Sequence, residues 1–229
     1  FINKGRVNLI KFSDLLVPAM LQTFRTVMFS LFSAIILILL PKIASAEELG
    51  NVVKMTQSAG EMELSTSNGF IVKVQVLDNK VFRIWAGPNR KLTPAGDKIA
   101  PIVLNSDSPK GQFKLSDAGD YSVLATEAFN LRIYKTPLRF ALYRADNKTL
   151  LWNELKPLDI SAENSYQTLS SASDEHYFGG GQQNGHFEFR GKSLEISYSG
   201  GWEENDRPSP APFYMTNTGY GVLRNTWAD

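Results

Sequence analysis

Apolar and polar residues alternate in several short segments of the chain. In "GFIVKVQVLDNKVFRIW", Val72, Val74 and Val76 occupy every second position, and the alternation resumes after a polar break at Asp78-Asn79. A period of two places successive side chains on opposite faces of a strand, and a polar break is typical of a chain reversal. The pattern therefore predicts a β-hairpin with one buried face.

The same pattern recurs further along the chain. In "LRFAL", Leu138, Phe140 and Leu142 alternate with Arg139 and Ala141, and the polar cluster "RADNK" follows. The shorter segments "LEISY", "PFYMT" and "YGVLRNTW" also resemble strands and are separated by turn-forming residues. A helical repeat is not sustained anywhere after the first 46 residues. We therefore predict an all-β fold, an antiparallel β-sandwich of two packed sheets.

The first 46 residues have a different character. A basic stretch precedes the 14-residue apolar run "VMFSLFSAIILILL", and Ala44, Ser45 and Ala46 form an A-x-A cleavage pattern. This order is typical of a secretory signal peptide, and the run is shorter than the roughly 20 residues of a membrane-spanning helix. We expect a leader and signal helix in residues 1–46, a domain in residues 47–229, export to the periplasm or extracellular space, and no stable membrane span after cleavage. An uncleaved N-terminal anchor is the alternative.

Charge and composition exclude several classes of function. The chain has 24 basic and 23 acidic residues, so it lacks the positive excess that nucleic acids require. It has no cysteine and only two histidines, which leaves no thiolate metal site and no disulfide. We expect neither a nucleic-acid partner nor a metal or other cofactor.

The glycine-rich segment "EHYFGGGQQNGHFEFRGK" resembles phosphate-binding loops only superficially. A dinucleotide fingerprint would need glycine where Asn184 stands, and a P-loop would need glycine where His186 stands. Residues 179–181 are expected to provide positive φ angles or close backbone approach, and Asn184-Gly185 is expected to form a hairpin turn. His176 and His186 lack a serine or acid at a matching offset, so we expect them to be structural or surface residues.

A second polar segment, "WEENDRPSPAPFY", is a candidate carbohydrate site. It places Trp202, Asp206 and Arg207 on a proline-stiffened loop that also contains two glutamates. Carboxylates accept hydrogen bonds from sugar hydroxyls, and aromatic rings stack on the apolar face of a pyranose. A solvated acidic loop without a ligand is the alternative interpretation.

The order of motifs in the second half resembles the N-terminal, galactose-mutarotase-like β-sandwich of glycoside hydrolase family 31, the α-glucosidase and α-xylosidase family. The motifs are an acidic residue, an aromatic residue, a glycine turn, an Arg-Gly pair, a Pro-aromatic strand and a Gly-Tyr-Gly-Val hairpin before an asparagine. They fall at Glu175, Tyr177, Gly179 to Gly181, Arg190-Gly191, Pro212-Phe213-Tyr214, Gly219 to Val222 and Asn225. Together with the upstream strands, the resemblance covers most of residues 65–228.

The resemblance implies a retaining enzyme that acts on α-linked glucosides or xylosides through two carboxylates. In the family both carboxylates lie in a (β/α)8 barrel, which would follow Asp229, so we expect no catalytic residue in this chain. The oligosaccharide or glycoside substrate and the chain's own C-terminal barrel are the expected partners. A loop of the N-terminal domain reaches the barrel mouth in the family. By its position Asp206 matches the acidic substrate-contacting residue of that loop, with Arg207 and Trp202 as neighbouring contacts.

Several alternatives stay open at this point. Gln182 stands where many members carry glutamate, and "GGGQQNG" is similar to the form found in glucosyltransferases and α-glucan lyases of the family. A self-contained carbohydrate-binding sandwich is a second alternative. A mutarotase-like epimerase is a third, and it would need a His/Glu acid-base pair that only His176 or His186 could complete.

Overall fold

The computed structural model describes residues 47–87, 111–160 and 165–224. Those residues form antiparallel strands and turns, and no helix occurs among them. Within these ranges there is accordingly no helix that could cross a membrane. The signal helix predicted in residues 1–46 lies outside the described residues and stays a prediction.

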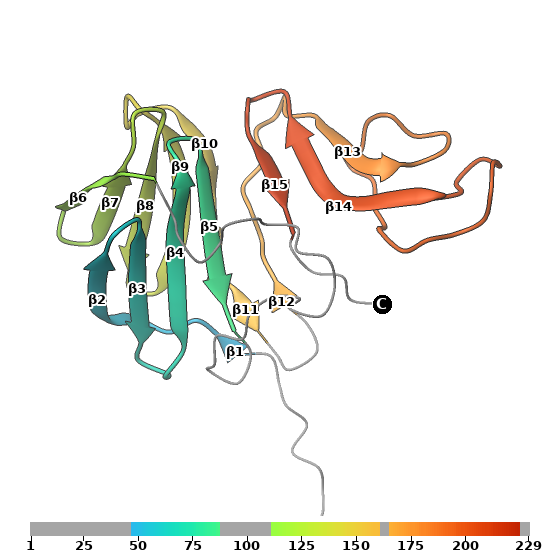
Figure 1. Cartoon of the computed structure of the whole chain (residues 1–229). Coiled ribbons are helices and arrows are strands. Elements are labelled where there is room, and N and C mark those ends of the chain that lie inside the picture. Colours follow the sequence, from blue (N-terminus) through green and yellow to red (C-terminus); the bar gives the residue numbers. More distant parts are fainter. Residues whose placement is uncertain (1–46, 88–110, 161–164, 225–229) are drawn as a thin grey trace, which may run out of the picture. The chain divides into compact units, whose positions relative to one another are not determined.

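The first large sheet contains the predicted hairpin. Its four strands follow the order β2 (Val52–Ser58), β3 (Glu61–Thr66), β4 (Ile71–Asp78) and β5 (Val81–Ala86), coloured from blue to green in Figure 1. Strands β4 and β5 pair antiparallel, with Val74 opposite Ile84. Val72, Val74 and Val76 are fully buried, as the alternation predicts.

The second large sheet has five strands. Their order is β10 (Leu150–Asn153), β9 (Leu138–Arg144), β8 (Phe129–Lys135), β7 (Tyr121–Ala125) and β6 (Lys114–Asp117). Leu138, Phe140 and Leu142 are buried, as predicted, but Ala141 on the opposite face is buried as well. Arg132 lies directly opposite Ala141, and its guanidinium stacks on Tyr143 at 3.8 Å from the ring centre. Long side chains therefore cover the outer face of this sheet.

A single apolar core joins the two large sheets. It takes residues from β3 and β4 on one side and from β7, β8, β9 and β10 on the other. The buried members from these strands are Met62, Leu64, Val72, Val74, Val76, Leu124, Leu131, Ile133, Leu138, Phe140, Leu142, Leu151 and Trp152. Because both sheets contribute their apolar faces to this core, the predicted antiparallel β-sandwich is confirmed.

Two further sheets complete the described fold. A small sheet joins β1 (Glu47–Glu48), β11 (Asp159–Ile160) and β12 (Ser165–Tyr166). The other has the order β13 (Tyr177–Gln182), β14 (Ser209–Thr216) and β15 (Gly221–Leu223), drawn in orange and red in Figure 1. Tyr214 and Val222, which pair across β14 and β15, pack against the apolar core. The sheet of β13, β14 and β15, called here the third sheet, thus contributes to the sandwich core through one face.

The strand predicted at "LEISY" is wrong. Between β13 and β14 the only strand-like pairing in the described residues is the single bridge from Ser199 to Arg207. Side chains occupy backbone acceptors of this segment, because Gln183 donates to the carbonyl of Glu195 and Arg207 donates to the carbonyl of Ser197. Carbonyls bonded in this way do not need a neighbouring strand.

Candidate functional site

The three consecutive glycines bring β13 close to β14. Gly179, Gly180 and Gly181 have φ angles of 124°, 76° and 74°, and the pairing register with β14 shifts across them. A Cβ on Gly181 would lie 2.2 Å from the carbonyl oxygen of Ser209, so a side chain cannot fit there. The expectation of positive φ and close backbone approach is confirmed, and the glycines serve the sheet.

Asn184-Gly185 is a turn, as predicted, but it is not the turn of a hairpin. The amide of His186 donates to the carbonyl of Gln183 at 3.3 Å, which closes a tight turn. The chain does not return along β13, because β13 pairs with the distant β14. The turn instead contacts residues 200–206, called here the 200–206 loop.

Asn184 holds the 200–206 loop with four hydrogen bonds. Its amide donates to the carbonyl of Asp206 at 2.9 Å, and its carbonyl accepts from the amide of Asn205 at 3.1 Å. Its side-chain Nδ2 donates to the carbonyls of Glu203 at 3.0 Å and Gly201 at 3.4 Å. One residue thus satisfies backbone groups at both ends of the loop, and these bonds restrict its conformation.

Asp206 stabilises the same loop from inside. It is half-buried, and its Oδ2 accepts from the amides of Gly201 at 2.8 Å and Glu203 at 3.0 Å. Gly200 has a φ of 57°, and a Cβ there would lie 2.0 Å from Oδ1 of Asp206. Among the described residues Oδ1 has no hydrogen-bond donor. One carboxylate oxygen therefore caps the loop, and the other is free to accept from a ligand.

Arg207 and Trp202 occupy different environments. The Arg207 guanidinium donates to the Ser197 carbonyl at 2.9 Å and forms an ion pair with Glu195 at 2.9 Å. Trp202 is 83% exposed. Arg207 therefore ties the loop to residues 195–199, whereas Trp202 presents its ring to solvent. Trp202 and Asp206 thus lie on the 200–206 loop, and Arg207 follows it directly in the chain.

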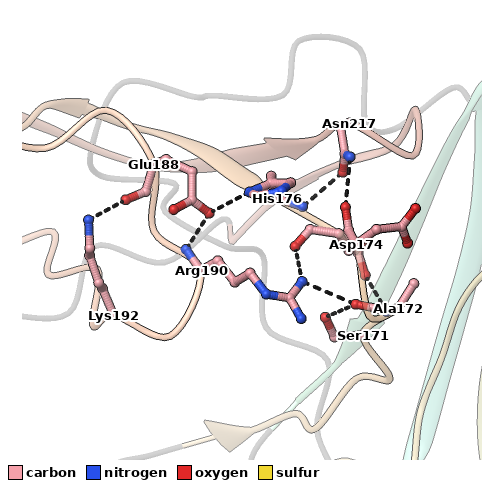
Figure 2. Close-up of polar contacts among 9 residues, drawn as sticks. Ser171, Ala172, Asp174, His176, Glu188, Arg190, Lys192 and Asn217 are labelled. Carbon is pink, nitrogen blue, oxygen red and sulfur yellow. Dashed lines mark hydrogen bonds and ion pairs between the residues drawn. The ribbon is translucent and has the colours of Figure 1, made fainter.

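The Arg-Gly pair anchors the base of this region, as Figure 2 shows. Nη1 of Arg190 donates to the carbonyls of Ala172, at 3.2 Å, and Glu175. The carboxylate of Glu188 accepts from the Arg190 amide at 2.6 Å, and the Glu188 carbonyl accepts from Nζ of Lys192 at 3.1 Å. The two Arg190 side-chain bonds attach residues 188–192 to the segment that precedes β13, and the Glu188 bonds close a turn within residues 188–192.

Both histidines are partly exposed and hydrogen-bonded. Nδ1 of His176 lies 3.2 Å from Oε1 of Glu188, and Nε2 of His186 lies 2.9 Å from Oδ1 of Asn205. Desolvation raises the pKa of Glu188, but hydrogen bonds from the Arg190 amide and His176 outweigh it, so the pKa is lowered. A carboxylate with a lowered pKa is a weaker general base. Because Oε1 of Glu188 also accepts from the Arg190 amide, the His176–Glu188 pair fits a structural contact better than the acid-base pair of an epimerase.

Asn217 and the buried Glu175 connect the third sheet to the segment before it. Asn217 accepts from the His176 amide at 2.8 Å and donates to the Asp174 carbonyl at 2.9 Å (Figure 2). The Glu175 carboxylate accepts from the Ala172 amide at 3.1 Å and from the Thr218 hydroxyl at 3.3 Å.

The polar surroundings of Glu175 keep its carboxylate charged. Burial raises its pKa, but neighbouring polar groups, first the Tyr220 hydroxyl and then the Ala172 amide, outweigh burial and lower it. The buried Tyr220 hydroxyl does not meet the geometry of a hydrogen bond with any group among the described residues. It nevertheless favours the charged form of the Glu175 carboxylate.

Sequence reasoning identified the loop but missed the residues that hold it. Asn184 was expected only to form a turn, and Arg190 stood only as one member of a motif. Their partners are backbone carbonyls, which carry no residue-specific signal. Within the described ranges no group of three or more potential metal ligands occurs, so these residues hold no candidate metal centre.

Comparison with known protein families shows the family of this chain. Residues 71–229 match the glycosyl hydrolase 31 N-terminal galactose mutarotase-like domain. The chain belongs to this family. No curated protein matches the sequence.

Solved structures agree with this fold. The Flavobacterium johnsoniae GH31 dextranase in complex with glucose has a TM-score of 0.68 at 17% identity, covering 77% of this chain and 22% of that one. The cycloalternan-forming enzyme from Listeria monocytogenes in complex with a pentasaccharide substrate has a TM-score of 0.65 at 19% identity, covering 79% of this chain and 18% of that one. A GH31 α-xylosidase from a soil metagenome, complexed with xylose, has a TM-score of 0.56 at 17% identity, covering 75% of this chain and 28% of that one. The chain therefore spans between 18% and 28% of the length of these enzymes.

Proposed function

We propose that this chain is the N-terminal domain of an exported, retaining glycosidase that acts on α-linked glucosides or xylosides. Its family membership supports the enzyme class, and the apolar run before Ala46 supports export. The two catalytic carboxylates would belong to a following (β/α)8 barrel. The chain itself would support that barrel and contribute the 200–206 loop to the substrate site.

The preorganised 200–206 loop is the observation that carries this proposal. It combines an exposed indole at Trp202 with a carboxylate oxygen of Asp206 that is free to accept. Trp202 would stack on the apolar face of the leaving sugar, and Oδ1 of Asp206 would accept from a sugar hydroxyl. Arg207 would act indirectly, because its guanidinium is already bonded to Ser197 and Glu195.

One face of the third sheet supports a role in holding the barrel. Phe213 lies opposite Leu223, and Met215 lies opposite both Phe178 and Gly221, so these side chains share a face. Phe213, Met215 and Leu223 are exposed, whereas the other face packs on the core. Exposed apolar surface of this kind is typical of a domain interface.

The test replaces Asp206 in the full-length enzyme in two ways. Asp206→Asn keeps an acceptor for the loop amides but turns Oδ1 into a donor, whereas Asp206→Ala removes both functions. A charge-assisted hydrogen bond contributes about 1.5 to 3 kcal/mol, so we expect KM for an oligosaccharide to rise roughly 10- to 100-fold with kcat little changed. The measurement is steady-state kinetics, with Glu127→Ala, at an exposed turn of the sandwich, as control. Wild-type kinetics in both Asp206 variants would refute the assignment.

Gln182 supports a second candidate, transfer or lyase chemistry in place of hydrolysis. Its side chain is exposed and contacts Asn184, with 3.4 Å between Nε2 and Oδ1. Mass analysis of the full-length enzyme's products separates these outcomes. Hydrolysis releases free sugars, transfer releases longer or rearranged glycans, and a lyase releases an unsaturated sugar.

A further inference from the structure

Asn184 connects two parts of the chain that are distant in sequence. Its backbone amide and carbonyl bond Asp206 and Asn205, and its side chain bonds Gly201 and Glu203. Trp202 lies between the two residues whose carbonyls the side chain engages. The backbone on both sides of Trp202 is therefore attached to Asn184.

Other contacts also restrain the 200–206 loop. His186, in the same turn as Asn184, contacts the Asn205 side chain at 2.9 Å, and Asn205 has the positive φ of 70°. Oδ2 of Asp206 bonds the amides of Gly201 and Glu203, the same two residues whose carbonyls bond Asn184. Asn184 thus holds the peptide group before Trp202 through the Gly201 carbonyl, and Asp206 holds the one after it through the Glu203 amide.

A loop held in this way loses little conformational freedom on binding. An exposed tryptophan on a mobile loop would have to be ordered when a ligand arrives, and that ordering weakens affinity. The indole of Trp202 is 83% exposed, so side-chain packing does not fix its position. Hydrogen bonds to the adjacent peptide groups are the remaining means of orienting it.

We propose that Asn184 is a positioning residue that orients Trp202 for binding of the leaving or acceptor sugar. This inference rests on the proposed function, because it assigns a sugar contact to the same loop. Asn184 does not touch the sugar. It raises affinity by holding the Trp202 backbone in the binding conformation.

The kinetic test is a double-mutant cycle in the full-length enzyme. Asn184→Ala removes the two side-chain hydrogen bonds to the 200–206 loop, so we expect KM for an oligosaccharide to rise about five- to tenfold with kcat within about twofold. Asn184→Asp, which keeps the shape but loses both donors, should behave alike. In a Trp202→Ala background, Asn184→Ala should have no further effect, because residues that act as a unit are not additive. Asn79→Ala, at the exposed β4–β5 turn, is the matched control.

A second readout does not depend on catalysis. Chymotrypsin cleaves after exposed aromatic residues, and cleavage requires local opening of the chain. Asn184→Ala should accelerate cleavage after Trp202 by about fivefold or more, at unchanged thermal stability of the whole protein. Mass analysis of the fragments identifies the cleavage site, and the Asn79→Ala protein should be cleaved at the wild-type rate.

The outcomes separate this inference from the proposed function. An unchanged cleavage rate, or a KM effect of Asn184→Ala that persists in the Trp202→Ala background, would overturn the positioning role. Faster cleavage together with wild-type KM in both single variants would refute the proposed sugar site, while the loop contact itself would stand. Faster cleavage with a raised KM that depends on Trp202 supports both.

Discussion

The sandwich and residues 183–207 are held together by different forces. The sandwich buries alternating apolar side chains, with Phe140 only 1% exposed. Residues 183–207 leave Trp202 and Phe187 each 83% exposed and depend on side-chain bonds to backbone groups, such as those of Asn184. Phe189 is buried in this segment, but Phe187, Tyr198 and Trp202 are exposed, so apolar burial contributes less here than in the sandwich.

Because of this difference, we expect the sandwich to determine the stability of the domain and residues 183–207 to determine binding. Burial of a large apolar side chain contributes several kcal/mol, whereas a hydrogen bond contributes a net of about 1 kcal/mol. Substitutions in the sandwich core should therefore unfold the domain, and substitutions in residues 183–207 should change local order and affinity. A site in such a segment can be rearranged with a smaller loss of stability than a change in the sandwich core would cause.

A buried carboxylate in the sandwich and a buried carboxylate beside the third sheet also differ in pKa. Glu154 is buried beside the sandwich core, where its carboxylate accepts from the Phe140 amide at 2.9 Å and from Gln167 at 2.6 Å. Burial raises the pKa of Glu154 despite these bonds. Glu175, beside the third sheet, has a lowered pKa because its polar neighbours outweigh burial. The polar groups around Glu175 thus favour the charged carboxylate more strongly, relative to burial, than those around Glu154 do.

The largest expected effect compares two phenylalanines. Phe140→Ala leaves a cavity in the core and should lower the free energy of unfolding by about 3 to 5 kcal/mol. Phe187→Ala, its exposed counterpart, should change it by less than about 0.5 kcal/mol. Urea unfolding followed by circular dichroism measures both. Equal losses in the two variants would remove the distinction between the regions.

The next effect tests the anchor at the base of residues 183–207. Arg190→Ala removes the bonds to the Ala172 and Glu175 carbonyls, and we expect a loss of about 1 to 2 kcal/mol because the site is partly exposed to solvent. Arg144→Ala, which removes a single bond to the Thr218 carbonyl, is the matched control, with an expected loss of about 0.5 kcal/mol. Hydrogen exchange should show the added opening of Arg190→Ala in residues 172–192. Uniform opening across the sandwich would contradict a local anchor.

The smallest effect concerns pH. The folded pKa of Glu175 is below its unfolded value, so its contribution to stability is present above the unfolded pKa of about 4.3 and is lost as pH falls through the folded pKa. The folded pKa of Glu154 is raised, so its contribution is present below about pH 4.3 and is lost as pH rises through the folded pKa.

Two glutamine variants test the opposite directions of these two pKa shifts. In Glu175→Gln the free energy of unfolding should fall less steeply below pH 4.3 than in the wild type. In Glu154→Gln the loss between about pH 4.3 and neutrality should disappear. Urea unfolding at a series of pH values provides the measurement. If both variants show the same pH dependence, the pKa values of the two carboxylates are not shifted in opposite directions.

Residues with a local pattern were predicted well. Val72, Val74 and Val76 are buried as their alternation indicates, and the loop that contains Asp206 was found from its composition. The strand expected at "LEISY" was wrong, because side chains from distant residues occupy the carbonyls there. Asn184 gave a turn signal only, since its partners are peptide groups that every residue possesses.

The sequence by itself determined the strands of the sandwich and the family. Alternation of apolar residues is a local property, and a strand that shows it must bury one face wherever it pairs. The tertiary structure decided which segments meet: β13 with β14, Arg190 with Ala172, and the Asn184 turn with the 200–206 loop. These contacts join residues distant in sequence through backbone groups, so their geometry depends on the folded sheet that brings them together.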